Sequence, residues 1–239
     1  MTRRRLVLFD IDGTLLSAGG ISARALSATL RESFGTEGDA SSYDYSGKTD
    51  PQIVRELMRG AGFAEGEIDA RLPATLARYQ DRLLDWLRPE HVVAKPGVAP
   101  LLAALALDER VTLGLLTGNL EPCARAKIGP LDANRYFPFG AYGSDHEDRY
   151  RLPAVALERG RALAGIAFGG PDIVIVGDSV HDVLCGRSLG VRAVAVATGK
   201  TPPARLAEVA PHALLGDFMD TEAAVRAILG DETLNHDSR

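Results

Sequence analysis

Residues 6–14 read LVLFDIDGT, a short apolar run that ends in two aspartates, a glycine and a threonine. Four consecutive apolar residues are too few for an isolated helix, but they are typical of a strand buried on both faces of a parallel sheet. Asp10 and Asp12, two residues apart at the end of such a strand, can point into one site, and Gly13 allows a sharp turn there. A like-charged pair this close is costly unless a cation or unequal protonation relieves it. The stretch therefore predicts a buried strand that delivers two carboxylates to a site.

Further apolar runs and helical patterns alternate along the chain beyond residue 92. Alternating strands and helices predict an α/β fold with a parallel sheet. The expected strands cover 111–116, 173–176 and 193–197, and the expected helices cover 98–107, 153–163, 180–189 and 221–229.

Residues 17–92 interrupt this alternation, because they show helical periodicity and no buried strand. Asp50 followed by Pro51 predicts a helix start with Asp50 as the N-cap. One helix is expected before it, and one or two follow at 67–87, with Pro73 marking a helix start or a break. We therefore expect a Rossmann-like core formed by 1–16 and 93–239, with a helical domain of 17–92 inserted after the first strand.

Two more polar clusters follow expected strands. Asp178 and Asp182 come after the strand at 173–176, and Thr117, Gly118 and Asn119 come after the strand at 111–116. Ligands of open α/β sheets bind at the carboxyl ends of the strands. Carboxylates there suit a hard cation such as Mg²⁺, and a hydroxyl with amides suits phosphate oxygens.

The overall composition is that of an ordinary globular protein, with 46% apolar residues, 25% charged residues and a net charge of −5. No basic stripe is present, which argues against a nucleic-acid partner. The apolar run after the basic start is too short for a signal peptide, and no run approaches the roughly 20 residues of a membrane span. The sequence predicts a cytoplasmic protein without a membrane partner, and it leaves monomer and homodimer open.

The three motifs together resemble the signature of the haloacid dehalogenase superfamily, in the branch that is similar to phosphoglycolate phosphatases. Residues 10–14 match its DxDGT motif, Thr117 matches its Ser/Thr motif, and Gly177-Asp178-Ser179 with Asp182 matches its GDSxxD motif. The insert at 17–92 lies where that family carries a helical cap.

The resemblance implies a Mg²⁺-dependent phosphatase that acts on a small phosphorylated metabolite, of the phosphoglycolate or sugar phosphate type. Asp10 would be the nucleophile and form an aspartyl-phosphate, and Asp12 would protonate the leaving oxygen and then activate water. The metal would be held by Asp10, the backbone carbonyl of Asp12 and Asp178, with support from Asp182. Thr117, together with the neighbouring Gly118 and Asn119, would hold the phosphoryl oxygens.

The third motif of the family departs from its usual lysine. The matching stretch at 148–153 reads DRYRLP, so Arg149 or Arg151 must supply the basic group, and Lys127 is a further candidate. An arginine can neutralise phosphoryl and carboxylate charge as a lysine does. In the helical insert, Lys48 is a candidate for contact with a second anionic group of the substrate, although it also suits a solvated position before a helix.

Other functions remain open at this stage. A phosphomutase would use the same aspartyl-phosphate and return the phosphoryl group to a sugar. A non-catalytic binding module could keep the fold, but Asp10, Asp12 and Asp178 are all present. A receiver domain also gathers aspartates at strand ends, but it lacks an insert such as 17–92.

Overall fold

The computed structural model describes residues 4–230, and its centre is a six-stranded parallel sheet with the strand order β5-β4-β1-β6-β7-β8. This confirms the predicted α/β fold class with a parallel sheet. The outermost residues of the predicted core, 1–3 and 231–239, lie outside the described part. The strands are β1 Arg5–Phe9, β4 Val111–Leu116, β5 Gly140–Ala141, β6 Ile173–Gly177, β7 Arg192–Val196 and β8 Ala213–Leu215.

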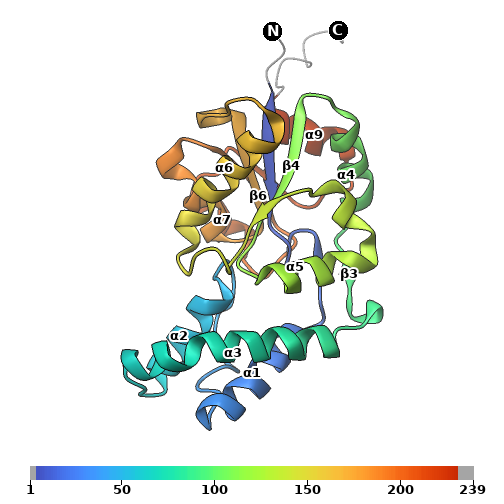
Figure 1. The fold of residues 1–239 in the computed structure, drawn as a ribbon. Helices are drawn as coiled ribbons and strands as arrows, with labels where there is room; N and C mark the ends of the chain where they lie inside the picture. The colour runs from blue at the N-terminus through green and yellow to red at the C-terminus, as the bar shows by residue number, and fades with distance from the viewer. Residues whose placement is uncertain (1–3, 231–239) are drawn as a thin grey trace, which may run out of the picture.

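Helices cover both faces of this sheet (Figure 1). Side chains of successive strand residues point to opposite faces, so Val7 and Phe9 pack with α4 and α9, whereas Leu6 and Leu8 pack with α6. The sheet is therefore buried on both sides, as its uninterrupted apolar strands require. The helices of this part are α4 Val98–Leu107, α5 Glu121–Ile128, α6 Leu152–Ala164, α7 Val180–Cys185, α8 Pro203–Glu208 and α9 Thr221–Leu229.

The helical insert, residues 17–92, contains three α-helices that lie beyond the carboxyl ends of the strands (Figure 1). They are α1 Ile21–Phe34, α2 Asp50–Gly60 and α3 Glu65–Trp86. The chain enters and leaves the insert through two short antiparallel strands, β2 Leu16–Ser17 and β3 Val93–Ala94. The domain limits at 17 and 92 stay a prediction.

Two local expectations in the insert were wrong. Pro73 neither starts nor ends a helix, because α3 runs through it for 22 residues. Asp50 is not the N-cap: Thr49 is, and its hydroxyl accepts the amide hydrogen of Gln52. Asp50 is the first helical residue, and its carboxylate is free to bind elsewhere.

Candidate active site

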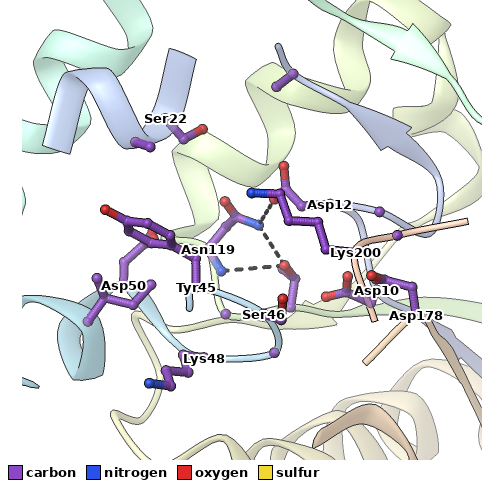
Figure 2. Close-up of a pocket in the computed structure, with 18 of the residues that line it drawn as sticks. Asp10, Asp12, Ser22, Tyr45, Ser46, Lys48, Asp50, Asn119, Asp178 and Lys200 are labelled. Carbon is purple, nitrogen blue, oxygen red and sulfur yellow. Dashed lines mark hydrogen bonds between the residues drawn. The ribbon is translucent and has the colours of Figure 1, made fainter. Parts of the chain in front are cut away.

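Three buried carboxylates meet at the carboxyl ends of β1 and β6. These two strands are neighbours, with Phe9 paired to Val176, so the residues that follow them come to the same edge of the sheet. One oxygen from each of Asp10, Asp178 and Asp182 lies within 4.8 Å of the other two. Figure 2 shows Asp10 and Asp178 side by side at one end of a cavity.

Arg149 is the basic group that faces these carboxylates. Its guanidinium Nη2 donates to Asp10 Oδ1 at 3.0 Å and also to Asp182 Oδ1. Its side chain is only 2% exposed, whereas that of Arg151 is 70% exposed and lies 3.9 Å from Asp148. The short 3₁₀ turn Arg149–Arg151 points the two arginines in different directions. Of these two candidates for the third motif, the structure brings only Arg149 to the site.

Not all the carboxylate oxygens are already taken. Asp182 Oδ2 accepts from the amide and the hydroxyl of Ser179, at 2.9 and 2.6 Å, so both of its oxygens are occupied. Asp178 Oδ1 accepts from the Thr14 hydroxyl at 3.0 Å. Within residues 4–230, Asp10 Oδ2 and Asp178 Oδ2 accept no hydrogen bond. These two oxygens are therefore available to a ligand, while Asp182 orients Arg149 and Ser179.

The close packing of acids shifts their protonation equilibria. Burial raises the pKa of Asp10 well above its usual value, and the Asp182 carboxylate adds to this rise while Arg149 opposes it. Burial and Asp182 together raise the pKa of Asp178 to about 7. One guanidinium does not balance three carboxylates, so a bound cation would stabilise their ionised forms. An all-oxygen, buried set with free carboxylate oxygens fits a hard divalent cation.

Glycines leave room for this arrangement. Gly13 has a φ of +93°, which favours glycine, and a Cβ there would lie 2.4 Å from Asp178 Oδ2. A Cβ on Gly199 would lie 1.6 Å from the same oxygen. The loops after β1 and β7 therefore close directly around the Asp178 carboxylate, which is 5% exposed as a residue.

Asp12 belongs to a separate hydrogen-bond network from the three buried carboxylates. Its Oδ2 accepts from Asn119 Nδ2 at 2.8 Å and from Lys127 Nζ at 2.7 Å. Asn119 also donates to Thr117 Oγ1 at 2.7 Å, and the bonds that Asn119 donates to Asp12 and Thr117 are drawn in Figure 2. Since Thr117 Oγ1 accepts here, its own hydrogen remains available to a phosphoryl oxygen. Asp12 is the half-exposed acid of the site, with 43% of its side chain accessible.

A cavity of about 540 Å³ joins these groups to the helical insert. The insert contributes a wall rich in hydroxyl groups, formed by Ser17, Ser22, Ser42, Tyr43, Tyr45, Ser46 and Tyr79. Ser22 Oγ is buried without a hydrogen-bond partner among the described residues, and Figure 2 shows it across the cavity from Asp10. Gly118 also lines this cavity, and a Cβ on it would lie 2.0 Å from the Lys48 carbonyl oxygen.

The Lys48 ammonium group does not point at the carboxylates. Its Nζ donates to Glu56 Oε2 at 2.7 Å and to the Tyr43 hydroxyl at 3.0 Å, and Figure 2 shows it directed away from Asp10. Lys95 and Lys200 also line the cavity, and Figure 2 shows Lys200 pointing into it. The insert therefore offers Lys48 in an ion pair rather than as an open anion site.

Lys127 and Asp50 were not assigned to this part of the site from the sequence. Lys127 was a minor candidate for the third motif, but it contacts Asp12 and not Asp10. One feature of the sequence could have revealed this role. Lys127 lies on the same face of α5 as Cys123, Ala124 and Ile128, which are all fully buried. Asp50 was interpreted as a helix cap, and only the fold brings its carboxylate to the amide of Leu120 at 2.8 Å.

Comparison with known proteins places this geometry in a family. Residues 7–196 match the haloacid dehalogenase-like hydrolase family. Phosphoglycolate phosphatase 1 of Pseudomonas aeruginosa is 28% identical over 243 residues, which cover 97% of this chain and 85% of that protein. Phosphoglycolate phosphatase of Agrobacterium fabrum is 27% identical over 224 residues, covering 89% of this chain and 88% of that protein.

Solved structures agree with the fold. A predicted phosphatase from Clostridium acetobutylicum superposes with a TM-score of 0.72 at 17% identity, covering 94% of this chain and 99% of that one. None of the helices among residues 4–230 has the length and apolar character needed to cross a membrane. The family match spans both strand ends that carry the carboxylates, as well as the insert between them, and it confirms the resemblance found in the sequence: this chain belongs to the haloacid dehalogenase-like hydrolase family.

Proposed function

We propose that this protein is a Mg²⁺-dependent phosphatase that hydrolyses a small phosphate monoester through an aspartyl-phosphate on Asp10. The observation that carries the proposal is the state of the Asp10 carboxylate. One oxygen is held by Arg149 at 3.0 Å, and the other is free of hydrogen bonds from the described residues and lies in the cavity wall. A carboxylate fixed in this way is suited to attack phosphorus in line with the leaving group.

In the first step, Asp10 Oδ2 forms a bond to phosphorus while the bond from phosphorus to the leaving oxygen breaks. Asp12 gives its proton to that oxygen, and the alcohol departs. In the second step, water attacks the aspartyl-phosphate, Asp12 takes the proton of that water, and inorganic phosphate leaves with Asp10 restored. General acid–base assistance of this kind contributes about 10²–10⁴-fold to a rate.

The remaining groups bind and orient the phosphoryl group. The Thr117 hydroxyl can donate to one phosphoryl oxygen, and Arg149 supplies positive charge beside Asp10. Asp10, Asp178 and the Asp12 main-chain carbonyl would hold Mg²⁺, with Asp182 supporting them through its bonds to Arg149 and Ser179. When bound, the cation would neutralise charge on the carboxylates and on the phosphoryl oxygens.

The size and lining of the cavity favour a small polar leaving group. The cavity measures about 540 Å³, and its wall on the insert side carries many hydroxyl groups. Both the phosphoglycolate and the sugar phosphate type fit these limits, and the named relatives act on phosphoglycolate.

We propose that the helical insert works as a cap that excludes water from the reacting groups, and that the enzyme acts in the cytoplasm.

The test is phosphate release from a panel of phosphate monoesters, measured with and without Mg²⁺, for the native protein and an Asp10→Asn variant. Release that requires both the metal and Asp10, with a phosphorylated peptide containing Asp10 after rapid quenching, would support the proposal. Release that persists in Asp10→Asn would sink the aspartyl-phosphate. Isomerised sugar phosphate in place of free phosphate would identify a mutase.

A further inference from the structure

Lys127 is a fully buried lysine whose charged end reaches the active site from behind Asp12. It belongs to α5, and its side chain is only 2% exposed. Burying an ammonium group is costly unless it is paired and hydrogen-bonded. The Lys127 Nζ meets that condition with Asp12 Oδ2 at 2.7 Å and Asn119 Oδ1 at 2.6 Å.

These contacts determine the orientation of Asn119. Because its Oδ1 accepts from Lys127, its Nδ2 must face Asp12 and Thr117, to which it donates at 2.8 and 2.7 Å. An amide side chain can otherwise turn over at little cost, since its two ends have similar shapes. Lys127 therefore holds both the Asn119 amide and, through it, the Thr117 hydroxyl.

The same contacts fix the Asp12 carboxylate. Both hydrogen bonds that Asp12 accepts with its side chain reach Oδ2, and none among residues 4–230 reaches Oδ1. The side chain is 43% exposed and lines the cavity, so Oδ1 is the oxygen left to exchange a proton with substrate or water. A carboxylate on a half-exposed loop would otherwise sample several rotamers, including ones that turn toward the cation site.

We propose that Lys127 is a positioning residue for the general acid–base step: it locks Asp12 Oδ2, through one direct bond and one bond by way of Asn119, so that Oδ1 faces the leaving oxygen. The inference rests on the role proposed above for Asp12. It gives the two buried basic residues of the active site different tasks. Arg149 contacts Asp10 and Asp182, whereas Lys127 contacts Asp12.

The test uses substrates with different need for an acid. An alkyl phosphate such as glycerol 2-phosphate requires protonation of its leaving oxygen, whereas p-nitrophenyl phosphate releases a stable phenolate. We compare kcat and KM for both substrates in the native protein, Lys127→Met and Lys127→Arg. Arg125→Met is the matched control, since Arg125 lies on the same helix and donates to the Phe137 carbonyl oxygen at 2.6 Å, away from Asp12.

For Lys127→Met we expect kcat/KM to fall about 10²-fold with the alkyl phosphate and about 10-fold or less with the aryl phosphate, the size of a lost acid–base contribution. The loss should lie in kcat, with KM changed little. Lys127→Arg should recover part of the alkyl activity, because a guanidinium can also bond to Asp12 and Asn119. Arg125→Met should leave the ratio of the two kcat/KM values unchanged.

An equal loss on both substrates, or a loss confined to KM, would overturn the inference and leave Lys127 a structural or anion-binding residue. If Lys127→Met does not fold, the same ratio measured in Asn119→Ala decides, because this variant removes the bond by way of Asn119: an unaltered ratio contradicts the proposal. A native protein that hydrolyses neither substrate, or an Asp10→Asn variant that hydrolyses both, would refute the proposed function itself, which is a different outcome.

Discussion

The main-chain amide of Asp50, at the start of α2, donates a hydrogen bond of 2.8 Å to the carbonyl oxygen of Gly118, just after β4. The Asp50 carboxylate accepts the amide hydrogen of Leu120 at 2.8 Å in the same loop. The helical insert is thereby joined to the loop that carries Thr117, the proposed ligand of the phosphoryl group. On the proposed function, movement of the insert as a cap would be transmitted to the phosphate-binding groups through this backbone.

Gly118→Ala should separate the insert from this loop. A Cβ at position 118 would lie 2.0 Å from the Lys48 carbonyl oxygen, which is backbone and cannot rotate away. We expect kcat/KM to fall by about 10²-fold, the cost of a displacement of about 1 Å in the groups that bind substrate. Steady-state kinetics with a circular dichroism spectrum measure this. Native kinetics in the folded variant would show that the insert need not lie this close during turnover.

Asp10→Asn should remove activity and alter the response to the metal. Loss of the proposed nucleophile is expected to lower kcat by about 10⁴-fold or more. Because one of three crowded carboxylates becomes neutral, the metal-free variant should melt about 2–4 °C above the metal-free native protein, equivalent to about 1 kcal/mol. The increase in Tm on adding Mg²⁺ should shrink. Thermal melts with and without Mg²⁺ measure both effects, and an unchanged increase would mean that Asp10 does not contact the cation.

The two arginines of the third motif provide a matched pair. Arg149→Met would leave Asp10 and Asp182 buried without their partner, at a cost of about 3–5 kcal/mol in the free energy of unfolding, and kcat should fall as well. Arg151→Met should be close to native in both, because the Arg151 side chain is 70% exposed. Urea unfolding and phosphate release distinguish them. Equal effects of the two changes would contradict the assignment of Arg149.

Asp50→Asn should alter how stability depends on pH. Burial raises the pKa of Asp50 from its ordinary value to about 6, and this is opposed by Lys127 and by the Leu120 amide. Since the folded protein holds this proton more tightly than the unfolded chain, the stabilisation is present below about pH 4 and is lost as pH rises to about 6. Between these pH values the free energy of unfolding of the native protein should fall by about 3 kcal/mol relative to that of Asp50→Asn. Urea unfolding of both proteins at pH 4 to 7 measures the difference, and parallel pH profiles would refute it.

Short-range features of the sequence were sufficient for most of the framework. Strand β4 and helices α4 and α9 begin and end where the apolar pattern placed them. Strands β5 and β8 were missed because two or three residues do not make a pattern. Helix α3 continues through Pro73 because buried residues on both sides of it, Ile68 and Tyr79 among them, pack the helix in place and offset a cost of roughly 3 kcal/mol.

The sequence by itself determined the fold class, the family and the three places where polar residues follow strands, because strand ends in a parallel sheet necessarily meet at one edge. Only the tertiary structure decided which basic residue serves which acid. Arg149 and Arg151 are two positions apart, so the direction of one short turn sends the first to Asp10 and the second to solvent. Lys127 lies 115 residues from Asp12 along the chain, and only the packing of α5 on the core brings the two to 2.7 Å. Contacts between distant segments depend on how whole elements pack, and no local pattern of residues records them.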